Sequence, residues 1–257
     1  MNIDTVQLII VAVFIAISAS FLGVFAILKR MALVGDALSH VALPGIALGI
    51  LWKFDPLLGA VVFLVIATIG VWLLETRTQL SVETIVGVFF SASLALGALI
   101  TPEPELAEAL FGNITALKWQ ESLISVILSI IIVIILLAVH KKLALNMVSS
   151  DLANSVGIKN RQLEFIYLLI FALSVALGIH FVGALLMGSL VIIPAASAKN
   201  IAKSLNVFMV LSIIFGVFAT ISGILISQTY HYSPGPIFVL ISTAIFIFSI
   251  IFKGLRK

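Results

Sequence analysis

Residues 31–52 read MALVGDALSHVALPGIALGILW, an apolar stretch that contains two ionisable side chains, Asp36 and His40. The two are four positions apart, so a helix places them on one face, one turn from each other. A charge in the middle of a bilayer costs about 2.5–3.5 kcal/mol, and ionisable residues in such spans usually serve a function. A carboxylate and an imidazole at this spacing are suitable ligands for a divalent cation. The stretch therefore predicts a membrane helix whose polar face forms part of an ion path.

A proline follows the pair at position 44. It predicts a kink, because proline removes a backbone donor from the helix, and interrupted helices in membranes often border cavities. A purely structural interpretation is equally open at this point. Asp36 would then cap a helix that begins after Gly35, and His40 would be a packed core residue.

The composition is that of a polytopic membrane protein. Hydrophobic residues make up 62% of the 257 residues and charged residues 10%, and the mean hydropathy is +1.32, well above what a soluble core requires. The basic residues are scattered singly or in pairs between apolar runs, so the pI near 9.3 does not indicate nucleic-acid binding. The absence of cysteine excludes disulfides, iron–sulfur ligation and thiolate zinc sites.

Nine apolar runs predict an all-α, polytopic membrane bundle that forms a single transmembrane domain over residues 1–257. Most of the runs reach the roughly 17–25 residues that cross a bilayer, so we expect about nine transmembrane helices, and at least eight. The runs cover residues 6–28, 33–52, 57–74, 82–100, 122–139, 163–179, 181–198, 205–227 and 235–252.

The distribution of lysine and arginine predicts the orientation. With the N-terminus outside and the C-terminus in the cytoplasm, twelve basic residues lie in inner segments and only Lys53 and Lys118 in outer ones, as the positive-inside rule requires. If runs 163–179 and 181–198 were one broken helix, the basic connection after the second would face outward, so we expect two separate spans. The twelve are Lys29, Arg30, Arg77, Lys141, Lys142, Lys159, Arg161, Lys199, Lys203, Lys253, Arg256 and Lys257.

The largest inner segment, residues 140–162, predicts a short cytoplasmic helix. N-cap chemistry is supplied by Ser149, Ser150 and Asp151, and Gly157 marks the end. The residues that could form the apolar face are Leu152, Ala153, Val156 and Ile158. The outer segment 101–121 is rich in glutamate, which is typical of a solvated surface and also suits a surface that attracts cations.

Three further residues are candidates with weaker support. His180 and His231 lie near the outer ends of apolar runs, where either could line an entrance for a metal ion. Each alone is more typical of an interfacial histidine. Pro194 predicts a kink in the seventh run, beside a group of small residues that leave room for a path or a close packing partner.

Neither a GxxxxGK[ST] motif nor a nucleophile–base or paired-carboxylate pattern occurs in the chain. It is therefore predicted not to bind ATP through a P-loop, not to be an enzyme, and to have no intrinsic cofactor. The chain is predicted to move a solute without powering the movement alone.

Two longer motifs carry a resemblance to a known family. Residues 35–49, GDALSHVALPGIALG, resemble the second-helix motif of the permease subunits of zinc/manganese ABC importers. Residues 181–198, FVGALLMGSLVIIPAASA, are similar to another segment of that family. Shorter matches occur at residues 110–113 and 233–236, and together they run along nearly the whole chain in the expected order.

This resemblance implies a permease like those of type II ABC importers, working as a homodimer in the cell membrane. Its expected partners are a separate P-loop ATPase on the inner face and an extracellular or periplasmic metal-binding protein, with no nucleic acid. The cargo would be Zn²⁺ first and Mn²⁺ second, passing Asp36 and His40. The segment expected to contact the ATPase includes Asp151, Leu152, Ala153 and Gly157.

Two other functions fit the composition. A secondary transporter would use Asp36 as a proton or cation carrier and should contain inverted repeats, but the pair has no counterpart in the later half. A permease for a metal chelate or siderophore would have a similar fold without needing an intramembrane ligand pair.

Overall fold

The computed structural model describes residues 3–78, 80–100, 119–184, 186–230 and 232–254. Throughout these ranges the regular structure is helical, without strands. The helices are α1 (Ile3–Leu28), α2 (Val34–Val41), α3 (Leu43–Leu51), α4 (Pro56–Arg77), α5 (Val82–Ile100), α7 (Trp119–Val148), α8 (Ser150–Ser155), α9 (Asn160–Val182), α10 (Met187–Ile201), α11 (Leu205–Tyr230) and α12 (Pro234–Gly254).

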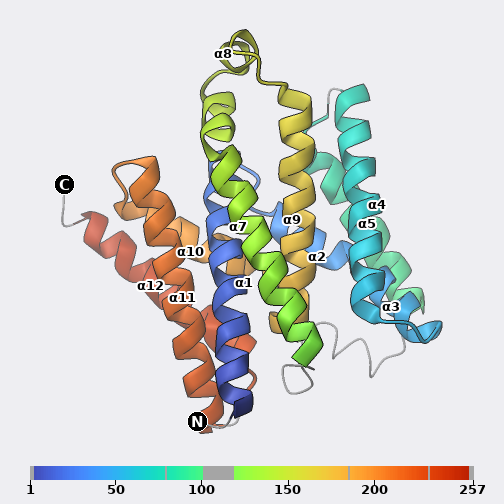
Figure 1. The fold of residues 1–257 in the computed structure, drawn as a ribbon, viewed down its shortest axis with the longest axis vertical. Coiled ribbons are helices and arrows are strands. Elements are labelled where there is room, and N and C mark those ends of the chain that lie inside the picture. The colour runs from blue at the N-terminus through green and yellow to red at the C-terminus, as the bar shows by residue number, and fades with distance from the viewer. Residues whose placement is uncertain (1–2, 79, 101–118, 185, 231, 255–257) are drawn as a thin grey trace.

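The predicted multi-pass helical architecture is confirmed. Within the described ranges, eight helical segments are long and apolar enough to cross a membrane, counting α2 and α3 together as one interrupted span. Figure 1 shows the long helices side by side, with the N-terminus at the bottom and the C-terminus at the upper left. The seventh predicted span, α10, is the exception, because its 15 residues extend only about 22 Å, short of the roughly 30 Å hydrocarbon core.

The predicted bounds of that seventh span, residues 181–198, are wrong at the beginning. The chain stays in α9 as far as Val182 and then turns at Gly183, whose φ of 87° lies in the left-handed region. Glycine adopts that conformation without a steric penalty, which ends the helix. The next helix, α10, begins only at Met187. The two segments are therefore separate helices, as expected, but the second is shorter and displaced along the sequence.

The second predicted span is divided at Ala42, between α2 and α3. Pro44 is the second residue of α3, a position where its missing N–H group leaves no hydrogen bond unmade. Pro194 lies inside α10 and is buried, so its ring removes one backbone hydrogen bond from the middle of that helix.

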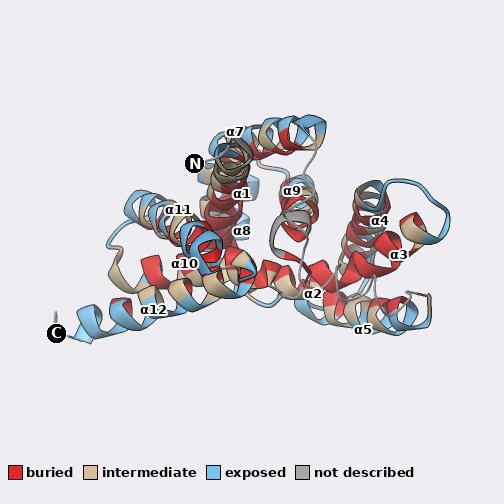
Figure 2. Cartoon of the chain, turned by 90° about the horizontal axis from the view of Figure 1, so that it is seen from below, coloured by how far each residue is buried: buried red, intermediate tan, exposed pale blue. Residues whose placement is uncertain are grey.

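Helix α1 lies at the centre of the packing, in contact with α7, α9, α10 and α11. Its buried aromatic residues Phe21 and Phe25 pack against each other. Figure 2 shows that α12, α10, α2 and α5 follow one side of the molecule, whereas α11, α1 and α7 lie toward the other. The outer surfaces of α5, α7 and α12 are rich in exposed apolar side chains, as expected of helices surrounded by lipid.

Helices α3 and α4 approach closely through two glycines. A Cβ atom added at Gly45 would overlap the backbone carbonyl of Gly59, and the reverse also holds. Neither position can therefore carry a side chain without separating the two helices.

Several contacts place the basic residues at one end of the bundle. An ion pair between Lys29 and Glu164 joins the end of α1 to the start of α9. The Trp72 indole Nε1 donates to the backbone oxygen of Arg161 at 3.1 Å, and the Arg161 guanidinium lies 4.8 Å from the centre of the Trp72 ring. Helix α8 follows at the same end, at the top of Figure 1.

Candidate functional site

Helix α2, which carries Asp36 and His40, lies at about the middle height of the bundle (Figure 1). It contacts α5, α9 and α10. Most of its residues are buried, while Asp36 is half-buried. The helix that carries Asp36 and His40 on one face is thus enclosed by protein near the centre of the described bundle.

The His40 side chain is buried, with 8% of its surface exposed. Its ring contacts the edge of the Phe90 ring on α5, with centroids 5.4 Å apart and planes at 72°. Among the described residues, no hydrogen-bond partner is found for Nδ1 of His40. A buried polar atom usually has such a partner, so an imidazole nitrogen without one is available to a ligand that enters the site.

The Asp36 carboxylate lies close enough to His40 for their charges to interact. The first turn of α10 packs directly against the backbone of Asp36. A Cβ atom at Gly188 would lie 2.7 Å from the Cβ of Asp36, closer than two carbon atoms can approach without displacement. Only glycine at position 188 permits this contact between α2 and α10.

Ser39 connects the same face of α2 to the turn that precedes α10. Its hydroxyl group lies 2.6 Å from the carbonyl oxygen of Asp36 and 2.6 Å from that of Ala184, and it can donate to either. The structure therefore brings together the two long motifs of the sequence, residues 35–49 and 181–198.

Three residues around the pair were missed from the sequence. Ser39 and Gly188 lie inside the two long motifs. The motifs marked these segments as important but did not indicate what either residue contacts. Phe90 had no signal, because an aromatic residue in an apolar span is ordinary. All three depend on contacts between separate helices, which one sequence does not reveal.

The structure does not describe the two histidine side chains that were predicted to line an outer entrance. His180 belongs to the last turn of α9, but its side chain is not among those described. His231 lies outside the described residues. Within the described part of the chain, no group of three or more histidine, cysteine, aspartate or glutamate side chains could hold a metal ion.

The predicted short helix at the basic end is confirmed as α8. The Ser149 hydroxyl accepts a hydrogen bond from the Leu152 amide at 3.2 Å, and the helix ends before Gly157, whose φ is 80°. Ala153 is fully buried, whereas Leu152 is 53% and Val156 65% exposed. The helix therefore rests on the bundle through one side and offers apolar groups on the other.

Comparisons with known proteins agree with this architecture. The model of the ABC 3 transport family matches residues 3–253. The chain is 35% identical to the high-affinity zinc uptake system membrane protein ZnuB of Haemophilus influenzae, over 89% of this chain and 90% of that protein. It is 31% identical to the manganese import system permease protein ScaB of Streptococcus gordonii, over 93% and 88%.

Among solved structures, PsaBC from Streptococcus pneumoniae in complex with Fab superposes with a TM-score of 0.86 and 27% identity, covering all of this chain and 96% of the matched chain. Both the sequence match and the shared fold extend over nearly the full length. The chain therefore belongs to the ABC 3 transport family, as a multi-pass membrane subunit of a transporter and not itself an enzyme.

Proposed function

We propose that this chain is the permease subunit of an ATP-driven, high-affinity importer of divalent metal ions, with Zn²⁺ as the first candidate and Mn²⁺ as the second. The observation that carries the proposal is the Asp36–His40 pair, one helix turn apart at the middle of the bundle. Nδ1 of His40 has no hydrogen-bond partner among the described residues. The printed names of relatives, which include zinc and manganese systems, support the same class of cargo.

The pair suits a passing cation. A metal ion that leaves water must replace its hydration shell with protein ligands; the Asp36 carboxylate compensates charge, and a neutral His40 imidazole supplies a nitrogen donor. Transport requires release as well as capture. Two protein ligands with water bind more weakly than a closed four-ligand site, which favours passage over retention.

A homodimer would place a second pair close to the first. Helix α2 lies on the side of the molecule that also contains α5, α10 and α12 (Figure 2). A twofold axis along this side brings two copies of α2 toward each other. The cation would then pass between the subunits, and each subunit would contribute Asp36 and His40.

The energy would come from a separate ATPase that docks on α8 at the cytoplasmic face, on the surface formed by Asp151, Leu152, Ala153 and Gly157. An extracellular or periplasmic binding protein would deliver the metal at the opposite end. The whole chain, residues 1–257, acts as one permease domain in the cell membrane, with its N-terminus outside and its C-terminus in the cytoplasm.

Reconstitution with the two partners tests this function. Vesicles that contain the complete transporter should accumulate radioactive Zn²⁺ when ATP is present, and Mn²⁺ should compete. Vesicles with the permease alone should not accumulate either ion. Uptake by the permease alone in response to an ion gradient would instead establish a secondary transporter, and uptake of chelated metal without free metal would establish a chelate permease.

A further inference from the structure

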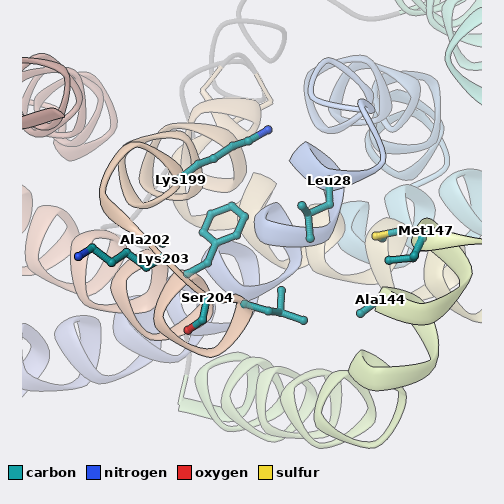
Figure 3. A pocket seen from close by; sticks show the side chains of 10 residues that line it. Leu28, Ala144, Met147, Lys199, Ala202, Lys203 and Ser204 are labelled. Atoms are coloured by element: carbon teal, nitrogen blue, oxygen red, sulfur yellow. The ribbon is translucent and has the colours of Figure 1, made fainter. Parts of the chain in front are cut away.

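A cavity of about 490 Å³ lies at the same end of the bundle as α8, where several membrane helices end. It is bounded by the last residue of α1, the last turns of α7 and the connection between α10 and α11. Figure 3 shows Leu28 and Met147 on one side of it and the α10–α11 connection on the other. Its volume is within the range of about 300–1,000 Å³ that is typical of small-molecule sites.

The interior of the cavity is apolar. Leu28, Met147 and Phe208 line it, and Val148 at its edge is 80% exposed. Because α1 ends and α11 begins here, this part of the cavity lies near the depth where the hydrocarbon of a bilayer meets its headgroups. Helix α7, with 30 residues, extends past that depth. An apolar wall at this depth suits a molecule that is itself partly hydrocarbon.

Two lysines supply positive charge at the cavity. Lys199, in the last turn of α10, and Lys203, in the connection to α11, both line it and are exposed. Among the described residues, no acidic side chain lines the cavity and neither lysine forms an ion pair. Lysine stems can lie along apolar surface while the ammonium groups reach toward headgroups. The cavity therefore combines an apolar wall with two cations that have no acidic partner in the described part of the chain.

The surroundings favour a lipid over a protein segment. Helices α7 and α11 both pack on α1 and lie with it away from the α2–α5 side (Figure 2). Their outer faces expose large apolar side chains, among them Ile134 and Leu137 on α7 and Ile214 and Phe218 on α11. Surfaces of this kind face acyl chains, so the occupant with direct access to the cavity is a membrane lipid.

We propose that this cavity binds an anionic phospholipid, with an acyl chain against Leu28, Met147 and Phe208. The phosphate would lie at the mouth of the cavity, attracted by the exposed lysines Lys199 and Lys203, whose ammonium groups point in different directions in Figure 3. A lipid in this position would fill the space between the ends of α1 and α7 and the start of α11. The site is distinct from the Asp36–His40 pair and requires no metal.

Binding can be measured on the full-length chain by titration with phosphatidylglycerol and native mass spectrometry. Phosphatidylglycerol should be retained more strongly than phosphatidylcholine, which carries no net charge. The double variant Lys199→Gln/Lys203→Gln should lose this preference. A lysine near an anionic membrane surface contributes about fivefold in affinity, so the pair should account for roughly 25-fold.

Two controls make the test specific. Lys141→Gln/Lys142→Gln removes the same charge from exposed positions on α7 that do not line the cavity, and should leave binding unchanged. Glycerophosphoglycerol carries the same phosphodiester group without acyl chains and should displace little lipid. A third variant, Ala144→Phe, places a large ring in the cavity wall and should weaken binding with both lysines present.

The proposal is overturned if phosphatidylcholine is retained equally, or if both lysine pairs reduce binding to the same extent. It is also overturned if glycerophosphoglycerol displaces the lipid completely, because the apolar wall would then contribute nothing. If Ala144→Phe does not fold, the two lysine double variants still test the proposed lipid site. All four lysine side chains are exposed, so replacing them should not disturb the fold.

Discussion

Asp36 owes its position to two neighbours that carry no charge. Gly188 allows the first turn of α10 to lie directly against the Asp36 backbone, and the Ser39 hydroxyl joins the same turn of α2 to the carbonyl of Ala184. The carboxylate is therefore held between two helices by backbone contacts, and its charge remains free to interact with a cation and with His40.

Replacing Gly188 with alanine should disturb this arrangement. The added methyl group would lie 2.7 Å from the Asp36 Cβ, so α2 or α10 must move, at a cost of roughly 1–3 kcal/mol for an overpacked core. We expect Gly188→Ala to unfold at a lower temperature in detergent and to transport several-fold more slowly. Gly87→Ala, where nothing lies within 4 Å, is the matched control and should behave like the unmodified chain. Equal uptake by both variants would show that the close contact is not needed.

The role of His40 predicts a pH dependence. Histidine is the side chain that ordinarily titrates near neutral pH, and a metal ion can bind only its neutral form. Protons should therefore compete with the metal, so that acidification raises the KM for uptake while saturating metal restores the maximal rate. Initial uptake rates over mildly acidic to neutral pH measure this, with the affinity of the isolated binding protein determined over the same range. A KM that does not change with pH would contradict metal ligation by His40.

The sequence predicted the Asp36–His40 pair but not the residues that contact it. The spacing of Asp36 and His40 placed both on one face of a helix, because that follows from local geometry alone. The contacts of Ser39, Phe90 and Gly188 join helices that are far apart in the sequence. A local sequence pattern therefore does not predict them. His180 and His231 stay predictions.

Among the helices, α8 is the one whose start and end could best be predicted from residue types alone. The N-cap was expected among Ser149, Ser150 and Asp151 and the end at Gly157; the structure shows the cap at Ser149 and the end before Gly157. The break before α10 was not expected at its observed place, because Gly183 was one of several glycines in an apolar region. No local sequence pattern indicates its left-handed conformation.

Changes in α8 should separate ATP hydrolysis from transport. Ala153 is fully buried beneath the helix, so Ala153→Asp places a carboxylate where it has no water and lifts α8 from the bundle. Gly157→Pro should act similarly, because proline fixes φ near −65° and the observed φ is 80°. We expect either variant to lose uptake while the partner's ATPase activity persists. Asn154→Asp, which adds the same charge at an exposed position, should retain uptake, and normal uptake by all three would exclude α8 as the coupling contact.

For the whole molecule, the topology can be tested by labelling. The contacts of Lys29 and Arg161 place them at the same end as α8, and the positive-inside rule predicts that this end is cytoplasmic. The chain contains no cysteine, so Ser155→Cys introduces a unique thiol. An impermeant reagent should fail to label it in sealed cells and should label it in inverted vesicles. Labelling in sealed cells would reverse the proposed orientation.

The overall architecture was accessible from the sequence because each span carries its own signal, an apolar run of sufficient length. The arrangement of those spans around α1 was not, since most of the apolar helices look alike as sequences. What distinguishes α1 and α9 as interior helices is which faces they bury, and this emerges only when the whole bundle is assembled.

The central claim is that Asp36 and His40 bind the transported metal. The most direct measurement is ATP-driven uptake of radioactive Zn²⁺ by matched amounts of reconstituted transporter carrying Asp36→Asn or His40→Ala. Asp36→Asn removes the negative charge and His40→Ala removes the nitrogen donor, so each change should abolish uptake without loss of protein from the membrane. Asp55→Asn, at an exposed helix cap that asparagine also satisfies, and His140→Ala, at the basic end, should transport normally. Uptake at the unmodified rate by both Asp36→Asn and His40→Ala would contradict the account and place the ion path elsewhere.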